Sequence, residues 1–314
     1  MTDLTDPIFH DVNAARAHLE SVLWPDGPVC PHCGEFDNVR KLKGKSHRPG
    51  LHQCNSCRGH FTVTVGTVLE RSKIPLNKWV LAFHLVSSSK KGISAHQLHR
   101  MLGVTYKTAW FMAHRIREAM RELNPGPLGG EGKTVEADET VIGGKEKNKH
   151  KSKRNPKNIG AVGKEIAFSL VERGGHVRSF HVPAVNAKTL RPILVTQVSR
   201  KSVLMTDDAG QYRVIGPEFA RHETVNHGIA EYVRGEAHSN TIEGYFSILK
   251  RGITGVYHHV SQQHLKRYLG EFDFRYNHRS ALGVDDHQRM NAALAGIEGK
   301  RLTYRRPDSR EARA

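Results

Sequence analysis

The sequence has no long apolar run, and this limits the classes of protein that it can encode. A membrane-spanning helix needs ~18–20 consecutive apolar residues, and no run approaches that length. The N-terminal stretch MTDLTDPIFHDVNAARAHLE carries acids before any apolar segment, which is not the pattern of a signal peptide. We therefore expect a cytoplasmic protein without a membrane partner.

Acidic residues are scarce relative to basic ones. The 314 residues include 31 Asp and Glu against 48 Lys and Arg, which gives a formal net charge of +17 and a pI near 9.9. Such a balance favours a polyanion partner, because each phosphate that a cation neutralises releases condensed counterions. The alternative is a merely soluble, positively charged surface, which charge alone does not exclude.

Cysteine is also scarce, and all four cysteines lie in one segment. They form two C-x2-C pairs, Cys30 with Cys33 and Cys54 with Cys57, and twenty residues separate the pairs. Each pair places two thiolates on one side of a tight turn, and Zn²⁺ binds four such ligands in a tetrahedron. Disulfides need an oxidising compartment, of which the sequence gives no sign. We predict a zinc ribbon with a structural Zn²⁺. The nearby histidines are expected to be bystanders: His32, His47, His52 and His60.

A phosphate-binding loop is lacking as well. The stretch PLGGEGKT is close to one, but Pro127 occupies the position of its first glycine. No strand pattern precedes it. Use of ATP is therefore not expected.

Composition and periodicity divide the chain into six segments. These are an N-terminal helical segment (1–24), the zinc ribbon (25–70), a helical region (71–123), a Gly- and Pro-rich linker (124–132), an α/β domain (133–290) and a basic C-terminal tail (291–314). The α/β assignment depends on strand patterns at 134–140, 165–172, 176–182 and 202–208, and on helical patterns at 186–199 and 240–251.

Within the helical region, residues 92–117 indicate two helices around a short turn. Ser94 can cap the first helix, and Gly103 supplies the permissive φ of the turn. The inner face of the first helix is expected to carry Leu98, Met101 and Leu102. This is the plan of a helix-turn-helix, whose second helix can enter the major groove of DNA. The residues in the first turn of that second helix would meet DNA: Tyr106, Lys107 and Thr108. An ordinary helical hairpin inside a core is the alternative.

Acidic residues end two of the predicted strands and open a late helix. Asp138 lies in TVEADET, with Glu136 and Glu139 beside it, and Asp207 lies in SVLMTDD. Glu243 follows 36 residues after Asp207. Acids at strand ends lie where α/β sheets place ligand sites. Three such carboxylates could hold two Mg²⁺ or Mn²⁺ ions ~3.5–4 Å apart, which is the arrangement for in-line attack at phosphorus. Strand-end acids are also common at loop entries, so this pattern alone is weak.

Basic and polar residues accompany these acids. Lys250 follows Glu243 by two helical turns, ~20° around the axis and ~10 Å along it, so it can hold the DNA phosphates that flank the reacting one. Asn240 shares that side, and Arg251 adjoins Lys250. We predict that these three residues contact DNA. The segment 145–158, KEKNKHKSKRNPKN, has seven Lys or Arg against one acid, and is either a solvated loop or a second nucleic-acid contact.

These features together resemble the DDE insertion-sequence transposases, specifically the ISXO-type group with an N-terminal zinc ribbon. The matching motifs are CPHCG…QCNSC, the helix-turn-helix, VEADETVIGGK, LMTDDAGQY, HSNTIEGYFSILKRGITGVYHHVS and LGEFDFRYNHR. They cover about residues 20 to 280 in the order of the family.

The resemblance implies an RNase H-like catalytic domain, a mixed sheet flanked by helices, over residues 133–290. Its catalytic and metal-binding acids would correspond to Asp138, Asp207 and Glu243. Lys250 matches the basic position that contacts transposon-end DNA, and the two glycines after the first acid correspond to residues 143 and 144. Asp208 is an alternative to Asp207, because the family often has Glu or another residue there. Asn240 rivals Glu243, because some relatives use the Asn of the H-x-N step.

The function that the resemblance implies is transposition. Such a protein binds the terminal inverted repeats of its element, cleaves the ends with a metal-activated water and joins the 3′ ends to target DNA. Its partner is double-stranded DNA, on which it would act in the nucleoid as at least a dimer. Two alternatives remain from other classes: a zinc-ribbon and helix-turn-helix regulator without catalysis, and an RNase H-like nuclease without strand transfer.

Overall fold

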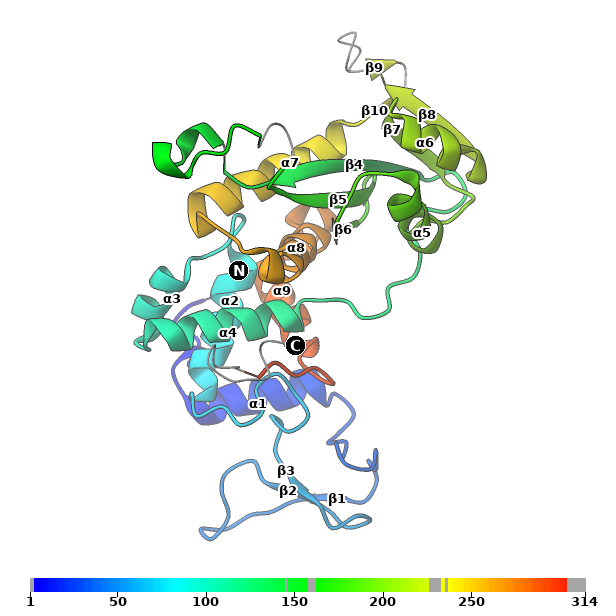
Figure 1. The fold of residues 1–314 in the computed structure, drawn as a ribbon. Helices are drawn as coiled ribbons and strands as arrows, with labels where there is room; N and C mark the ends of the chain where they lie inside the picture. Colours follow the sequence, from blue (N-terminus) through cyan, green and yellow to red (C-terminus); the bar gives the residue numbers. More distant parts are fainter. Residues whose placement is uncertain (1–2, 145, 158–161, 226–232, 235–236, 304–314) are drawn as a thin grey trace. The chain divides into compact units, whose positions relative to one another are not determined.

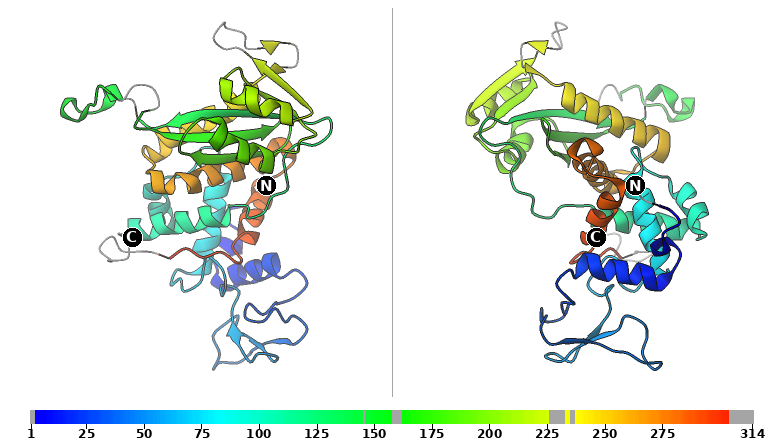
Figure 2. Two further views of the ribbon diagram at one scale, coloured as in Figure 1. Left: turned by 45° about the vertical axis from the view of Figure 1, so that its right-hand side comes forward. Right: turned by 180° about the vertical axis from the view of Figure 1, so that it is seen from behind.

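The computed structural model describes residues 3–144, 146–157, 162–225, 233–234 and 237–303 of the chain. The chain forms two compact units, drawn in Figure 1 and Figure 2. The first unit comprises Met1–Arg121 and Val284–Ala314, and the second comprises Glu122–Gly283. Within the described ranges, no helix combines the length and the apolar character that crossing a bilayer requires.

The first unit contains a helical core. Its helices are α1 (Val12–Leu23), α2 (Leu76–Ser88), α3 (Ala95–Leu102), α4 (Tyr106–Ala119) and α9 (Asp286–Ala295), with a 3₁₀ turn, η1 (Pro7–Phe9). Helix α2 packs against α1, α4 and α9, and Trp79 and Phe83 on α2 are fully buried. The α/β domain was expected to extend to residue 290, whereas the second unit ends at Gly283 and α9 belongs to the first.

The turn between α3 and α4 has the capping chemistry that its residues indicate. The Ser94 side chain accepts a hydrogen bond from the Gln97 backbone N–H, and Gly103 ends α3 with φ of 61°. Thr105 caps α4 by accepting from the Thr108 N–H. Met101 was expected on the inner face but is 49% exposed. The buried residues of α3 are Leu98 and Leu102, so the covered strip of this helix does not extend to Met101.

The same unit contains a small antiparallel sheet. Its strands are β1 (Val39–Lys41), β2 (His52–Cys54) and β3 (His60–Phe61), with β2 in the centre. Cys30, Cys54 and Phe61 are buried together here, with Trp24 packed against them. This small core brings both C-x2-C pairs to one place.

The second unit is built on a mixed five-stranded sheet. Its strands are β4 (Thr134–Ile142), β5 (Glu165–Glu172), β6 (Val177–Val182), β7 (Val203–Asp207) and β8 (Arg221–Val225), in the order β6-β5-β4-β7-β8. Strands β4, β5 and β6 pair antiparallel, whereas β4, β7 and β8 pair parallel. The helices of this unit are α5 (Ala187–Gln197), α6 (Gly210–Ile215), α7 (Asn240–Gly252) and α8 (Gln262–Asn277). Two short strands also occur, β9 (Val233–Arg234) and β10 (Ala237–His238). The turns are the π-helical η6 (Ile253–Tyr257) and the 3₁₀ turns η2 (Glu146–Asn148), η3 (Lys151–Lys153), η4 (Gly216–Glu218) and η7 (Ser280–Leu282).

Helices cover both faces of this sheet. Val135 and Ala137 of β4 pack in a core with α5 and α6. Ile142 of β4 and Ala167 of β5 pack in a second core with α7 and α8. Alternate residues of β4 therefore face different helix pairs, as the period of two in a strand requires. This mixed α/β architecture, with its five-stranded sheet between helices, is consistent with the RNase H-like fold expected from the sequence.

A buried carboxylate helps to attach α7 and α8 to the sheet. Asp273 on α8 accepts hydrogen bonds from the Ser179 backbone N–H (2.8 Å), the Ser179 hydroxyl (2.7 Å) and the Tyr245 hydroxyl of α7 (2.6 Å). Burial raises the pKa of Asp273 to about 7, although the hydrogen bonds from Ser179 and Tyr245 lower it. The folded state therefore keeps a proton that the unfolded chain releases near pH 4.

This shift predicts a pH-dependent contribution of Asp273 to stability. Between about pH 4 and pH 7 the contribution falls as pH rises, by at most ~1.4 kcal/mol per unit. Asp273→Asn removes the titration, so the stability difference between wild type and variant should shrink across this window. Urea unfolding of both proteins at several pH values measures it. A difference that stays constant with pH would contradict the prediction.

Candidate active site

The register of the parallel strands brings Asp138 and Asp207 level with each other. Thr134 lies opposite Val203, and Glu136 opposite Met205. The same register, continued by two residues, places Asp138 beside Asp207 at the end of β7. Residues in register on parallel strands point to the same face. Both aspartates therefore share the face of Glu136, which α7 covers.

Burial and the charges of neighbouring acids both affect the protonation of Asp138. Burial is the largest cause that raises the pKa of Asp138, to about 7, and the charges of Glu139, Asp207 and Glu243 raise it further. The Glu139 backbone N–H, 2.7 Å from Asp138 Oδ1, opposes the shift. Asp138, Asp207 and Glu243 thus form one cluster of negative charge, which a cation would stabilise.

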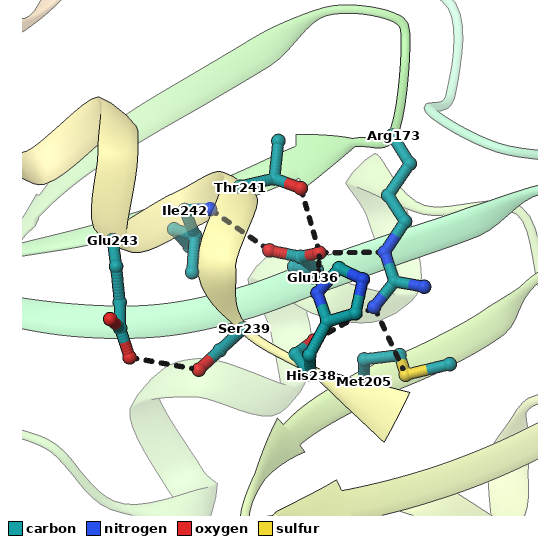
Figure 3. Close-up of polar contacts among 8 residues, drawn as sticks. All are labelled: Glu136, Arg173, Met205, His238, Ser239, Thr241, Ile242 and Glu243. Carbon is teal, nitrogen blue, oxygen red and sulfur yellow. Dashed lines mark hydrogen bonds and ion pairs between the residues drawn. The ribbon is translucent and has the colours of Figure 1, made fainter. Parts of the chain in front are cut away.

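Glu243 extends from the first turn of α7 and is exposed. Its Oε1 accepts a hydrogen bond from the Ser239 hydroxyl at 3.1 Å, as Figure 3 shows. Asn240 is the first residue of the same helix, and Lys250 and Arg251 lie in its last turn. All three are exposed, so α7 carries the predicted acid and the predicted DNA-contacting residues on one element.

Two neighbouring acids are placed differently from the cluster. Asp208 lies beyond the end of β7 with its side chain 43% exposed, and Arg213 Nη2 is 3.8 Å from its Oδ2. Glu139 faces the other side of the sheet, where the Tyr212 hydroxyl donates to its Oε2 at 2.6 Å. Burial raises the pKa of Glu139. The geometry favours Asp207 over Asp208 as the partner of Asp138.

The carboxylate oxygens of Asp138, Asp207 and Glu243 are hard ligands of the kind that Mg²⁺ and Mn²⁺ prefer. Within the part of the chain that the structure describes, the four cysteines alone form a group of three or more possible ligands within 4.8 Å of one another. The carboxylates are therefore more widely spaced. Mg²⁺ usually binds one or two carboxylates and completes its shell with water and phosphate oxygens.

The four cysteines form a compact cluster, with their Sγ atoms all within 4.8 Å of one another. The Sγ atoms of Cys30 and Cys57 are 3.7 Å apart, as are those of Cys33 and Cys54. Zn–S bonds of ~2.3 Å in a tetrahedron place sulfur atoms ~3.8 Å apart. The four residues fit a structural Zn²⁺, as the spacing predicted.

Two family models match this chain. The ISXO2-like transposase domain matches residues 127–277, and the transposase zinc-ribbon domain matches residues 11–60. The chain thus contains an ISXO2-like transposase domain and a transposase zinc ribbon.

Two known proteins are similar to this transposase to different degrees. An uncharacterized protein in transposable element ISH50 of Halobacterium salinarum is 29% identical over 283 residues, which are 86% of this chain and 92% of that protein. A chain in the structure of the simian T-cell lymphotropic virus intasome in complex with PP2A regulatory subunit B56 gamma is 14% identical, with a TM-score of 0.28. That match covers 56% of this chain and 63% of the other, so this transposase spans less than two thirds of the intasome chain.

The other residues expected to meet DNA lie at the surfaces of their own units. In the first turn of α4, Tyr106 and Lys107 are exposed, Thr108 is half-buried, and the Tyr106 ring stacks on His96 with centroids 4.3 Å apart. In the second unit, residues 146–157 of the basic segment follow β4 and include η2 and η3. The lysines of these turns are exposed. Residues 145 and 158 of that segment lie outside the described residues.

The burial and pairing of Glu136 were not predicted from the sequence. Glu136 was noted only as a neighbour of Asp138, yet its side chain is 0% exposed and pairs with Arg173 of the β5–β6 turn. A signal was present in the sequence. The strand period of two puts Glu136 on the face of Asp138, and an acid between Val135 and Ala137 in a buried strand requires a partner.

Proposed function

We propose that this transposase binds the terminal inverted repeats of its insertion sequence, cuts DNA at the element ends and joins the 3′ ends to target DNA. The observation that supports this most is the level placement of Asp138 and Asp207 on neighbouring parallel strands, with Glu243 close enough to raise the pKa of Asp138. Three carboxylates in this arrangement suit phosphoryl transfer assisted by divalent ions.

Two successive displacements at phosphorus would make up the reaction. In the first, water attacks the phosphodiester at the element end, the P–O3′ bond breaks and the element strand leaves with a free 3′-OH. In the second, this hydroxyl attacks a target phosphodiester and displaces the 3′ oxygen of the target strand. Mg²⁺ or Mn²⁺ held by Asp138, Asp207 and Glu243 would activate the attacking oxygen and stabilise the charge at phosphorus. One phosphodiester replaces another, so joining needs no ATP.

The remaining surfaces would bind and orient the DNA. Lys250 and Arg251 at the end of α7 would hold phosphates that flank the reacting one, and Asn240 would contact the same strand. Helices α3 and α4 would act as a helix-turn-helix, with Tyr106, Lys107 and Thr108 at the major groove. The zinc ribbon would stabilise the first unit without taking part in chemistry. Because an element has two ends, we expect at least a dimer on DNA in the nucleoid.

An oligonucleotide that carries the element end, incubated with Mg²⁺ and a plasmid, tests the proposal. Joined products support transposition, whereas nicks alone indicate a nuclease. A band shift without cleavage indicates a regulator and would contradict both the transposase and the nuclease assignments. A scrambled oligonucleotide of equal length is the control for end recognition.

The third ligand can be identified by comparing Glu243→Ala with Asn240→Ala. We expect Glu243→Ala to reduce end cleavage by about 100-fold or more, because it removes a charged oxygen donor from the cluster. Asn240→Ala removes a neutral contact and should weaken DNA binding more than the cleavage rate. Single-turnover cleavage at saturating protein separates the two effects. The reverse ranking would assign the ligand to Asn240.

A further inference from the structure

Glu136 is a fully buried carboxylate in the strand that carries Asp138. It lies two residues before Asp138 on the same face of β4 and is 0% exposed. Removing a carboxylate from water is costly unless hydrogen bonds and an opposite charge compensate it. Arg173 supplies the charge, with Nε 2.6 Å from Glu136 Oε1. The ion pair with Arg173 would by itself be enough to compensate the charge of Glu136.

The carboxylate has further partners at the start of α7. The Thr241 hydroxyl donates to Glu136 Oε1 at 2.9 Å, and the Ile242 backbone N–H donates to Oε2 at 2.9 Å (Figure 3). The first N–H groups of a helix have no partner within the helix, and a negative charge there is also stabilised by the helix dipole. A strand residue thus caps the helix that carries Glu243.

The residue that would ordinarily cap α7 is engaged elsewhere. Ser239 stands at the N-cap position, but its side chain makes no capping hydrogen bond. Its hydroxyl donates instead to Glu243 Oε1 at 3.1 Å (Figure 3). Because Glu136 takes over the cap, Ser239 is available to orient the carboxylate of Glu243.

Arg173 extends the same network to β7, the strand of Asp207. Its Nη2 lies 3.5 Å from the Met205 sulfur and donates to the His238 carbonyl oxygen at 2.8 Å, just before α7. The Glu136–Arg173 pair therefore contacts all three elements that carry the acid cluster, namely β4, β7 and the start of α7. In Figure 3 the contacts of Arg173, Thr241 and Ile242 meet at the Glu136 carboxylate, and those to Met205 and the His238 carbonyl end on Arg173.

We propose that Glu136 is a positioning residue that fixes the start of α7 against β4 and β7, and so sets the spacing of Asp138, Asp207 and Glu243 for divalent metal ions. This role rests on the proposed function, because it concerns the same acid cluster. Glu136 itself does not contact DNA or the ions. Groups that orient metal ligands typically contribute ~10- to 100-fold to metal affinity or activity.

Two variants test this role on the full-length protein. Glu136→Gln removes the charge, and Thr241→Val removes one donor while it keeps the branched shape and the Glu136–Arg173 pair. Thr196→Val is the matched control, because Thr196 lies on α5 on the other face of the sheet and its hydroxyl donates only to carbonyls of its own helix, Pro192 and Ile193. The measurements are Mn²⁺ binding by electron paramagnetic resonance, single-turnover cleavage of the end oligonucleotide, and the melting temperature.

We expect Thr241→Val and Glu136→Gln to weaken Mn²⁺ binding and to slow cleavage by ~10-fold or more, with end-DNA binding unchanged and Thr196→Val like wild type. If Glu136 had a merely structural role, the variants would melt at a lower temperature but would bind Mn²⁺ like wild type at temperatures where they are folded. That result would overturn the proposal. If Glu136→Gln does not fold, Thr241→Val decides alone. Wild-type cutting by the folded variants would overturn the positioning role and leave the proposed function intact. If Mn²⁺ binding depends on Glu136 but the protein does not cut DNA, the positioning role stands and the proposed function is overturned.

Discussion

Asp138→Asn and Asp207→Asn are each expected to abolish cutting and joining of element-end DNA, while binding of that DNA survives. Asn keeps the size of the side chain but removes one of the charges that would hold divalent ions. Metal ions contribute several kcal/mol to stabilisation of the transition state, and each ~1.4 kcal/mol is a tenfold change in rate. We therefore expect losses of about 1000-fold or more, measured by single-turnover cleavage in Mg²⁺.

Asp208→Asn is the matched control for this prediction. It makes the same chemical change one residue away, at a side chain that lies beyond β7 and near Arg213. This variant should cut DNA at a rate close to wild type. A large loss in Asp208→Asn together with activity in Asp207→Asn would move the metal site to Asp208. Full activity in Asp138→Asn would overturn the site as a whole.

Removal of the zinc ion should have the largest effect on stability. The sheet of β1, β2 and β3 has strands of only two or three residues, and its small core contains two of the cysteines themselves. Structural Zn²⁺ contributes ~10–16 kcal/mol to folding of zinc-finger peptides at neutral pH. Chelation, or Cys54→Ser, should therefore unfold this segment. Zinc content per chain and proteolysis between residues 25 and 70 measure the loss.

His60→Gln provides the comparison for the zinc prediction. His60 is an exposed residue of β3 in the same small sheet, and it was predicted to be a bystander rather than a ligand. The variant should keep one zinc per chain and the protease resistance of wild type. Zinc loss in His60→Gln, with zinc retained in Cys54→Ser, would show that the ligands were wrongly assigned.

The elements with strong local patterns were predictable from the sequence. Strands β4, β5, β6 and β7 and helices α5 and α7 lie within a few residues of their expected positions, because their apolar spacing and end residues are local features. Strand β8, with the sequence RHETV, was missed. It has little apolar alternation, and its strand structure comes from parallel pairing with β7. The burial of Met101 was predicted wrongly, because a sequence does not show how wide a strip of a short helix is covered.

The site was only partly predictable for a similar reason. Asp138, Asp207 and Glu243 could be named as candidates from strand ends and from the family resemblance. Their mutual placement depends on the register of β4 and β7, which no local pattern encodes. The contacts of Glu136 join residues that are 37 and 105 positions apart in the chain. A sequence can indicate that such a buried acid needs partners, but the partners follow only from the tertiary structure.

The division of the chain has a consequence for its synthesis. The first unit is interrupted after Arg121 and resumes at Val284, and α9, with buried Met290 and Leu294, packs against α2. At ~5–20 residues per second, a ribosome needs roughly 10–30 s to make the segment between these points. The N-terminal helices thus wait for their last partner until the whole second unit has been translated. Any property that needs the complete helical core, such as stable presentation of α3 and α4, arises only after the polypeptide with the acid cluster has been made.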